Sequence, residues 1–172
     1  MTQVCLVGSD DVNLRYELLS RETARNALVT YDLREPFDNT VQVQTVSLGA
    51  AVSLLNDLNW YLVRFTDAAF VKEPSISKSE WLSRDLATAV RENERDPDDT
   101  GRFLTVYGIV EDNERAGEDD GERAAEAATQ GRPPRLVEPM LLTRTGDTIP
   151  EYDLRDVKET LVVRVTAEEF GA

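Results

Sequence analysis

Two kinds of apolar segment alternate along the first two thirds of the chain, and this alternation constrains the fold more than any other feature. Short runs rich in β-branched residues, such as residues 4–7 and 40–48, predict strands. Segments with apolar residues at every third or fourth position predict helices, most clearly residues 49–65. Such an alternation favours a sheet covered by helices. We therefore expect an α/β fold with a mixed sheet, in β-α-β-α-β-α order followed by antiparallel C-terminal strands.

The predicted elements can be given approximate bounds. Strands are expected at residues 4–7, 40–48, 67–74, 102–110, 135–144 and 159–167, and helices at residues 11–26, 49–65 and 75–93. Ser77 and Glu80 have the spacing of a capping box at the start of the third helix. Pro139 indicates an edge position or a bulge in the fifth strand. Residues 27–33 fit either a helix end or a strand.

The length of 172 residues fits one domain, residues 1–172. Residues 111–134 carry almost no large apolar side chain, so burial there cannot offset the entropy lost on ordering. We expect this segment to be an acidic mobile loop between two strands. Cys5 is the only cysteine and lies in an apolar run, so we expect a buried thiol without a disulfide.

Charge is the most unusual property of the composition. The formal net charge is −14, and arginine far outnumbers lysine, which occurs only at Lys72, Lys78 and Lys158. An acidic surface of this kind is typical of proteins that work in molar salt, where a Debye length of ~3 Å screens repulsion between carboxylates. We expect a halophilic protein whose stability rises with salt. An ordinary acidic protein is the alternative.

The composition also excludes several functions. The chain has no histidine, which excludes Ser-His-Asp and Cys-His catalysis, and one cysteine cannot supply the usual zinc ligands. No basic patch suited to nucleic acid is present. No apolar stretch approaches the ~18 residues of a membrane span, so we expect a cytoplasmic protein without membrane contact.

The turn after the first predicted strand is the candidate site, and it comprises Gly8, Ser9, Asp10 and Asp11. Backbone N–H groups at a helix start can bind an anion. The two aspartates would instead accept those N–H groups as a helix cap, which is the favoured interpretation. The alternative is a Mg²⁺ ion bound by Asp10 and Asp11, since Mg²⁺ prefers carboxylate oxygens.

The same turn, with the amphipathic segment after it, resembles the first loop of response-regulator receiver domains. In that family an apolar strand ends in an acidic pair that binds Mg²⁺, and a helix follows. The resemblance covers roughly residues 3–75. The third predicted strand ends at Glu73 and Pro74 without a phosphoacceptor aspartate, so we expect no working phosphoswitch.

The chain as a whole, and residues 1–110 above all, resembles a family of uncharacterised haloarchaeal proteins. That resemblance implies an archaeal, cytoplasmic origin and no particular activity. The first functional hypothesis is a non-catalytic interaction or regulatory domain that acts through an unidentified protein partner. The second is a Mg²⁺-dependent or receiver-like ligand-binding domain that uses the turn formed by Gly8, Ser9, Asp10 and Asp11.

Overall fold

The computed structural model describes residues 1–111, 133–154 and 156–171. Within these residues the strands are β1 (Thr2–Gly8), β2 (Thr40–Thr45), β3 (Thr66–Lys72), β4 (Trp81–Ser83), β5 (Phe103–Val110), β6 (Arg135–Thr143) and β7 (Glu159–Val165). The helices are α1 (Leu14–Leu19), α2 (Glu22–Leu28), α3 (Leu48–Asp57), α4 (Asn59–Phe65), α5 (Arg84–Arg91), the short 3-10 helix η1 (Pro97–Asp99) and α8 (Ala167–Phe170). The expected acidic loop at 111–134 lies almost wholly outside the described residues.

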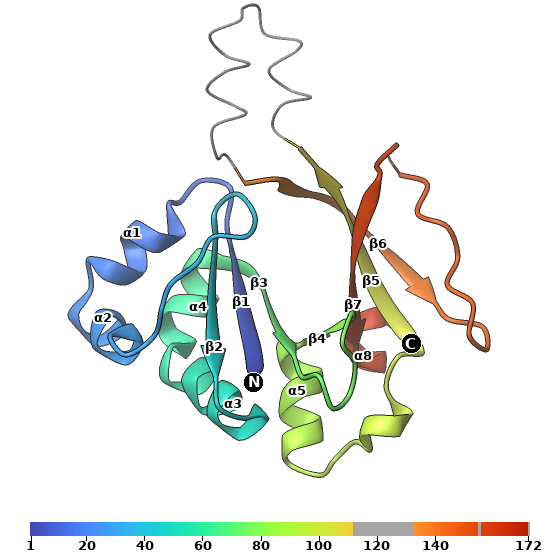
Figure 1. Cartoon of the computed structure of the whole chain (residues 1–172), viewed down its shortest axis with the longest axis horizontal. Coiled ribbons are helices and arrows are strands. Elements are labelled where there is room, and N and C mark those ends of the chain that lie inside the picture. The colour runs from blue at the N-terminus through green and yellow to red at the C-terminus, as the bar shows by residue number, and fades with distance from the viewer. Residues whose placement is uncertain (112–132, 155, 172) are drawn as a thin grey trace, which may run out of the picture.

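All these strands form one mixed sheet in the order β2-β1-β3-β4-β7-β5-β6 (Figure 1). Among the described strands only β4 and β7 pair in parallel, and β5 pairs antiparallel with both β6 and β7. The expected α/β class with a mixed sheet is confirmed. Because β1 pairs antiparallel with both β2 and β3, the arrangement differs from the parallel doubly wound sheet of a receiver domain.

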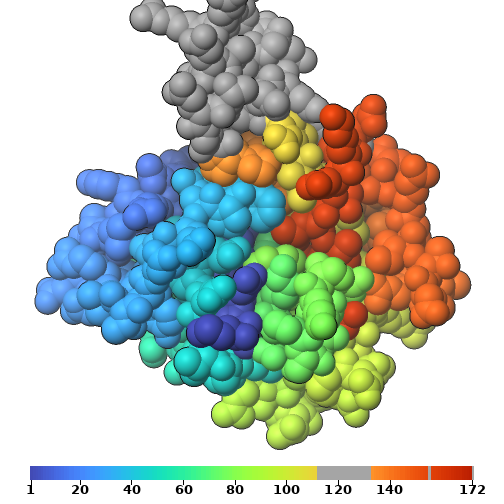
Figure 2. Space-filling view, viewed as in Figure 1, coloured from blue at the N-terminus to red at the C-terminus, as the bar shows by residue number. Residues whose placement is uncertain are grey.

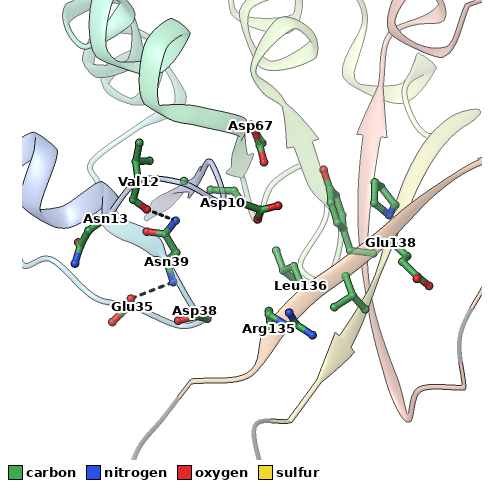
Figure 3. A pocket seen from close by; sticks show the side chains of 15 residues that line it. Asp10, Val12, Asn13, Glu35, Asp38, Asn39, Asp67, Arg135, Leu136 and Glu138 are labelled. Carbon is green, nitrogen blue, oxygen red and sulfur yellow. Dashed lines mark hydrogen bonds between the residues drawn. The ribbon is translucent and has the colours of Figure 1, made fainter. Parts of the chain in front are cut away.

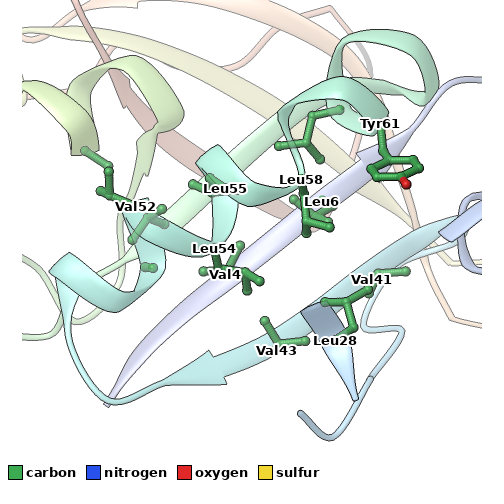
Figure 4. Close-up of a cluster of buried hydrophobic side chains, with 14 of the residues drawn as sticks. Val4, Leu6, Leu28, Val41, Val43, Val52, Leu54, Leu55, Leu58 and Tyr61 are labelled. Carbon is green, nitrogen blue, oxygen red and sulfur yellow. The ribbon is translucent and has the colours of Figure 1, made fainter. Parts of the chain in front are cut away.

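One face of the sheet carries the main hydrophobic core, under the helices from α1 to α5. Alternation along β1 directs Val4 and Leu6 to this face, where they meet leucines of α3 such as Leu54 (Figure 4). The helix α3 begins where the Ser47 hydroxyl accepts a hydrogen bond from the Ala50 N–H at 3.1 Å. The strands β1 and β2 thus lie under helices, as the alternation predicted.

The opposite face is concave. Tyr107 on β5 packs against Phe70 on β3 with ring centroids 5.6 Å apart, although β4 and β7 lie between those strands in the sheet. The sheet must curl for these rings to meet. The segments that precede the two edge strands, β2 and β6, also lie close together (Figure 2). The Asp38 N–H, before β2, donates a hydrogen bond to the Pro134 carbonyl, before β6, at 2.8 Å.

The helix predicted over residues 11–26 is wrong as a single element. Leu14 and Leu18 are fully buried in α1, and Ala24 and Leu28 are buried in α2. In one straight helix the second pair would point about 80° away from the first, since each residue turns the helix by about 100°. The break at Ser20 and Arg21 lets both pairs face the core.

The helix predicted over residues 49–65 is confirmed, with a one-residue interruption at Leu58 between α3 and α4. The helix predicted over residues 75–93 is wrong in its first half. Trp81 and Leu82 are buried on the strand β4, and α5 starts later, where the Ser83 hydroxyl accepts from the Leu86 N–H at 3.2 Å. This extra strand changes the predicted element order.

The expected capping box does not form. The Ser77 hydroxyl accepts from the Glu80 N–H at 3.0 Å, but the two residues make a turn before β4. The Glu80 carboxylate accepts from the Arg164 Nε at 2.7 Å and also binds Arg144. The spacing of Ser77 and Glu80 therefore marks a turn. The Glu80 carboxylate just before β4 binds Arg144, which follows β6, and Arg164 on β7.

The prediction for Pro139 is confirmed. β6 is an edge strand, and its register with β5 shifts by one residue near Gly108, as a bulge requires. Glu138 has a left-handed backbone with φ of 40°, which is uncommon for a residue other than glycine. The bulge bends β6 beside the concave face.

No helix among the described residues is both long enough and apolar enough to span a bilayer.

Candidate ligand-binding pocket

A pocket of about 870 Å³ lies at one end of the concave face (Figure 3). The end of β1 and the loop before β2 form one wall, and the bulged segment of β6 forms the facing wall. Val7 and Leu136 give it apolar contact surface from these opposite walls. The pocket therefore lies between parts of the chain that are more than 90 residues apart in sequence.

Gly8 belongs to the first wall, and its neighbours leave no room for a side chain. A Cβ atom there would lie 2.6 Å from the Asn39 Nδ2 and 2.8 Å from the Leu14 Cβ. The Gly8 N–H donates to the Asn39 carbonyl at 2.9 Å. Glycine is thus required for packing of this turn against Asn39, which explains it without a bound phosphate.

Asn39 holds the turn in place. Its Nδ2 donates to the carbonyls of Ser9 and Val12, each at 2.9 Å, and its Oδ1 accepts from the Leu14 N–H at 2.9 Å. Its backbone is left-handed with φ of 56°, a conformation that asparagine adopts more readily than most residues. The first wall is therefore fixed by one amide side chain, which the sequence analysis had not identified.

The four predicted site residues do not act together. Gly8 and Asp10 line the pocket, whereas Ser9 and Asp11 do not. The Ser9 hydroxyl donates to the Asp67 carboxylate at 3.1 Å and so links the turn to the start of β3. The structure thus brings Asp10 and Asp67 to the same pocket, and sequence reasoning had not identified Asp67.

The expected helix cap by the aspartates is wrong. The N-cap of α1 is Asn13, whose Oδ1 accepts from the Tyr16 N–H at 3.1 Å. Asp10 and Asp11 lie before it, in an exposed turn. Because the cap is supplied by Asn13, the carboxylate of Asp10 does not accept the helix N–H groups and lines the pocket instead.

Acidic side chains dominate the pocket. Five carboxylates line it, and of the described residues one arginine, Arg135, accompanies them. The carboxylates come from the first turn, the loop before β2, the start of β3 and the bulge of β6: Asp10, Glu35, Asp38, Asp67 and Glu138 (Figure 3). The lining therefore favours a cationic ligand.

Tyr107 on β5 also lines the pocket. Burial, followed by the nearby carboxylates of Asp67 and Glu169, raises the pKa of the Tyr107 hydroxyl to about 12. The hydroxyl is therefore neutral at physiological pH and can both donate and accept a hydrogen bond.

Arg135 lies on the facing strand, and its buried Nε has no hydrogen-bond partner among the residues that the structure describes.

The lining residues from β3, β5 and β6 carry no short motif. Asp67, Tyr107 and Arg135 meet only because the sheet curls, and no spacing in the sequence reports that curvature. No group of three or more His, Cys, Asp or Glu side chains placed to hold a metal ion occurs in the described part of the chain. The prediction of Mg²⁺ at Asp10 and Asp11 stays a prediction.

Together, the fold and the pocket define an α/β domain with one curled mixed sheet and an open acidic pocket on its concave face. The chain belongs to the family described as a family of unknown function (DUF5804), whose model matches residues 2–109. No curated protein and no solved structure matches the chain. The expected membership in an uncharacterised family is confirmed. The match runs from β1 into β5 and ends before β6.

Proposed function

We propose that this protein is a non-catalytic ligand-binding domain whose concave pocket takes a small organic cation. The observation that carries the proposal is the excess of five carboxylates over one arginine around a single pocket of about 870 Å³. Pockets for small molecules in proteins measure roughly 300–1,000 Å³. Both the size and the charge of this pocket therefore suit such a ligand.

An organic cation fits this lining better than a bare metal ion. The carboxylates are distributed over four segments around the pocket, whereas a metal ion needs its ligands at one point. Val7 and Leu136 offer contact to hydrocarbon groups, which an ammonium ion with an alkyl chain can use. Mg²⁺ on Asp10 and Asp11 is the competing hypothesis, although Asp11 lies outside the pocket lining.

The position of the pocket supports the regulatory role predicted from the sequence. Its two walls belong to opposite edge regions of the sheet, and the hydrogen bond from Asp38 to Pro134 joins them. A ligand that contacts both walls would stabilise this closure. A partner protein that contacts the closed edge would then bind more tightly when the ligand is present.

Isothermal titration calorimetry in molar KCl, with butylamine and MgCl₂ as separate probes, tests the proposal. We expect saturable binding of butylammonium that weakens by roughly tenfold in Asp10→Asn/Asp67→Asn, because two partly exposed ion pairs contribute up to ~1 kcal/mol each. Asp11→Asn is the matched control and should bind as the wild type does. Absence of saturable heat with butylamine would refute the proposal, and saturable heat with MgCl₂ alone would favour the competing one.

We also propose that the protein works in the cytoplasm of a halophilic archaeon. The net charge of −14 and the scarcity of lysine support this. At molar salt the repulsion between exposed carboxylates is screened over ~3 Å, so the acidic surface is compatible with a compact fold.

A further inference from the structure

A second, smaller pocket of about 230 Å³ adjoins the first on the concave face. Asp67 and Tyr107 line both pockets, so the two are neighbours across this pair of side chains. We call the larger one the outer pocket and the smaller one the inner pocket. The inner pocket is also lined by Ser83 and Glu169.

The inner pocket follows from the short length of β4. This strand has three residues and pairs with β3 only at Phe70 and Val71. The segment of β3 from Asp67 to Ala69 therefore has no β4 neighbour, and the inner pocket lies along it. The side chain of Glu169, from α8, reaches this region and accepts a hydrogen bond from the Ser83 hydroxyl.

The inner pocket has the same charge pattern as the outer one. Its lining includes three carboxylates, from Asp67, Asp85 and Glu169. Arg84 also lines it, but the Arg84 guanidinium donates to the Leu55 carbonyl at 3.3 Å and to the Asn56 side chain at 3.5 Å. Its hydrogen bonds are thus directed toward α3, and in the described part of the chain no ion pair joins it to the three carboxylates of the inner pocket.

We propose that the two pockets together form one elongated site for a linear aliphatic diamine or polyamine. This inference rests on the function proposed above and names its ligand class. One ammonium group lies among the outer carboxylates near Asp10, and a second lies in the inner pocket near Glu169. The methylene chain between them passes Asp67 and packs against the ring of Tyr107.

The chemistry of the shared residues suits this ligand. Ammonium groups donate three hydrogen bonds each, and carboxylates together with a neutral tyrosine hydroxyl accept them. A cation close to an aromatic ring gains further attraction from the face of the ring. The apolar side chains of Val163 and Val165, which line the inner pocket, suit methylene groups. A monoamine bound in the outer pocket would leave the carboxylates of the inner pocket without an ammonium group.

The test is calorimetric titration of the full chain in molar KCl with butylamine and with 1,4-diaminobutane, which differ by one ammonium group. We expect the diamine to bind the wild type about tenfold more tightly, as one further charge-assisted contact implies. Glu169→Gln should lose that preference and keep the affinity for butylamine. Glu168→Gln, which removes the same charge one position earlier on α8, is the matched control and should retain it.

Three results bear on the inference. Equal affinity of the wild type for the two amines would overturn it and leave the proposed function standing. An unchanged diamine preference in Glu169→Gln would also overturn it. No binding of either amine would refute the proposed function and the inference together. The wild-type comparison decides the question even if Glu169→Gln fails to fold, because it needs no variant.

Discussion

At the scale of single residues, Gly8 and Asn39 shape the first wall of the pocket. We predict that Gly8→Ala lowers the free energy of unfolding by about 1–3 kcal/mol, because the added Cβ overlaps the Asn39 amide and Leu14. Asp11→Ala, in the same turn, should change it by less than about 0.5 kcal/mol, since its side chain is exposed. Urea denaturation measures both. Equal effects would contradict this account of the turn.

The buried Cys5 thiol and the partly buried Tyr107 hydroxyl determine how the stability of the fold changes at alkaline pH. Burial raises the pKa of the Cys5 thiol to about 12, against an opposing effect of Lys72, and that of Tyr107 also to about 12. The folded chain therefore keeps protons that the unfolded chain releases. Their contribution is complete below about pH 9 and declines as pH rises toward 12.

The Tyr107→Phe variant isolates one of these groups. We predict that its urea midpoint falls less steeply than that of the wild type between about pH 10 and 12, because the variant has no hydroxyl to titrate. Measurement of both midpoints at several pH values checks this. Parallel curves would show that the Tyr107 hydroxyl does not titrate differently in the folded and unfolded chain.

At the scale of elements, the start of α5 distinguishes the observed fold from the helix predicted over residues 75–93. We predict that Ser83→Ala costs about 0.5–2 kcal/mol in unfolding free energy, because it removes the N-cap of α5 and the hydrogen bond to Glu169. Ser77→Ala should cost less, since Ser77 only closes a turn. A larger loss for Ser77→Ala would indicate that the helix begins there.

The same segment shows what sequence patterns could and could not predict. β1 and β2 were predictable because their β-branched residues form runs bounded by polar turns. β4 was not, because a strand of three residues is too short for a period-2 pattern, and Trp81 and Leu82 fit the helical spacing of the residues after them. Ser83, taken as a helix interior residue, is the actual cap.

The pocket was predictable only in part, for a related reason. Gly8 and Asp10 stand in a turn that the sequence marks, and both line the pocket. Asp67, Tyr107 and Arg135 come from three strands, and only the curl of the sheet brings them to this turn. Curvature depends on side-chain packing between distant strands, which no local pattern reports.

At the scale of the whole molecule, the charge of −14 predicts a steep dependence on salt. We expect the melting temperature to rise from dilute buffer to molar KCl, because added ions screen repulsion between surface carboxylates. Repeating the series in NaCl tests whether screening alone is responsible, since both salts screen equally. A melting temperature that stays constant across the range would contradict the proposed adaptation to salt.

The central claim is that the concave pocket binds an organic cation, and an NMR titration with butylamine tests it most directly. In ¹H–¹⁵N spectra recorded in molar KCl, we predict saturable shifts of the amides of Gly8, Asp10, Asp67, Tyr107 and Leu136, which line the pocket. Amides of α3, on the opposite face of the sheet, should stay unchanged. Saturable shifts confined to the helical face, or no saturable shifts at all, would contradict the claim.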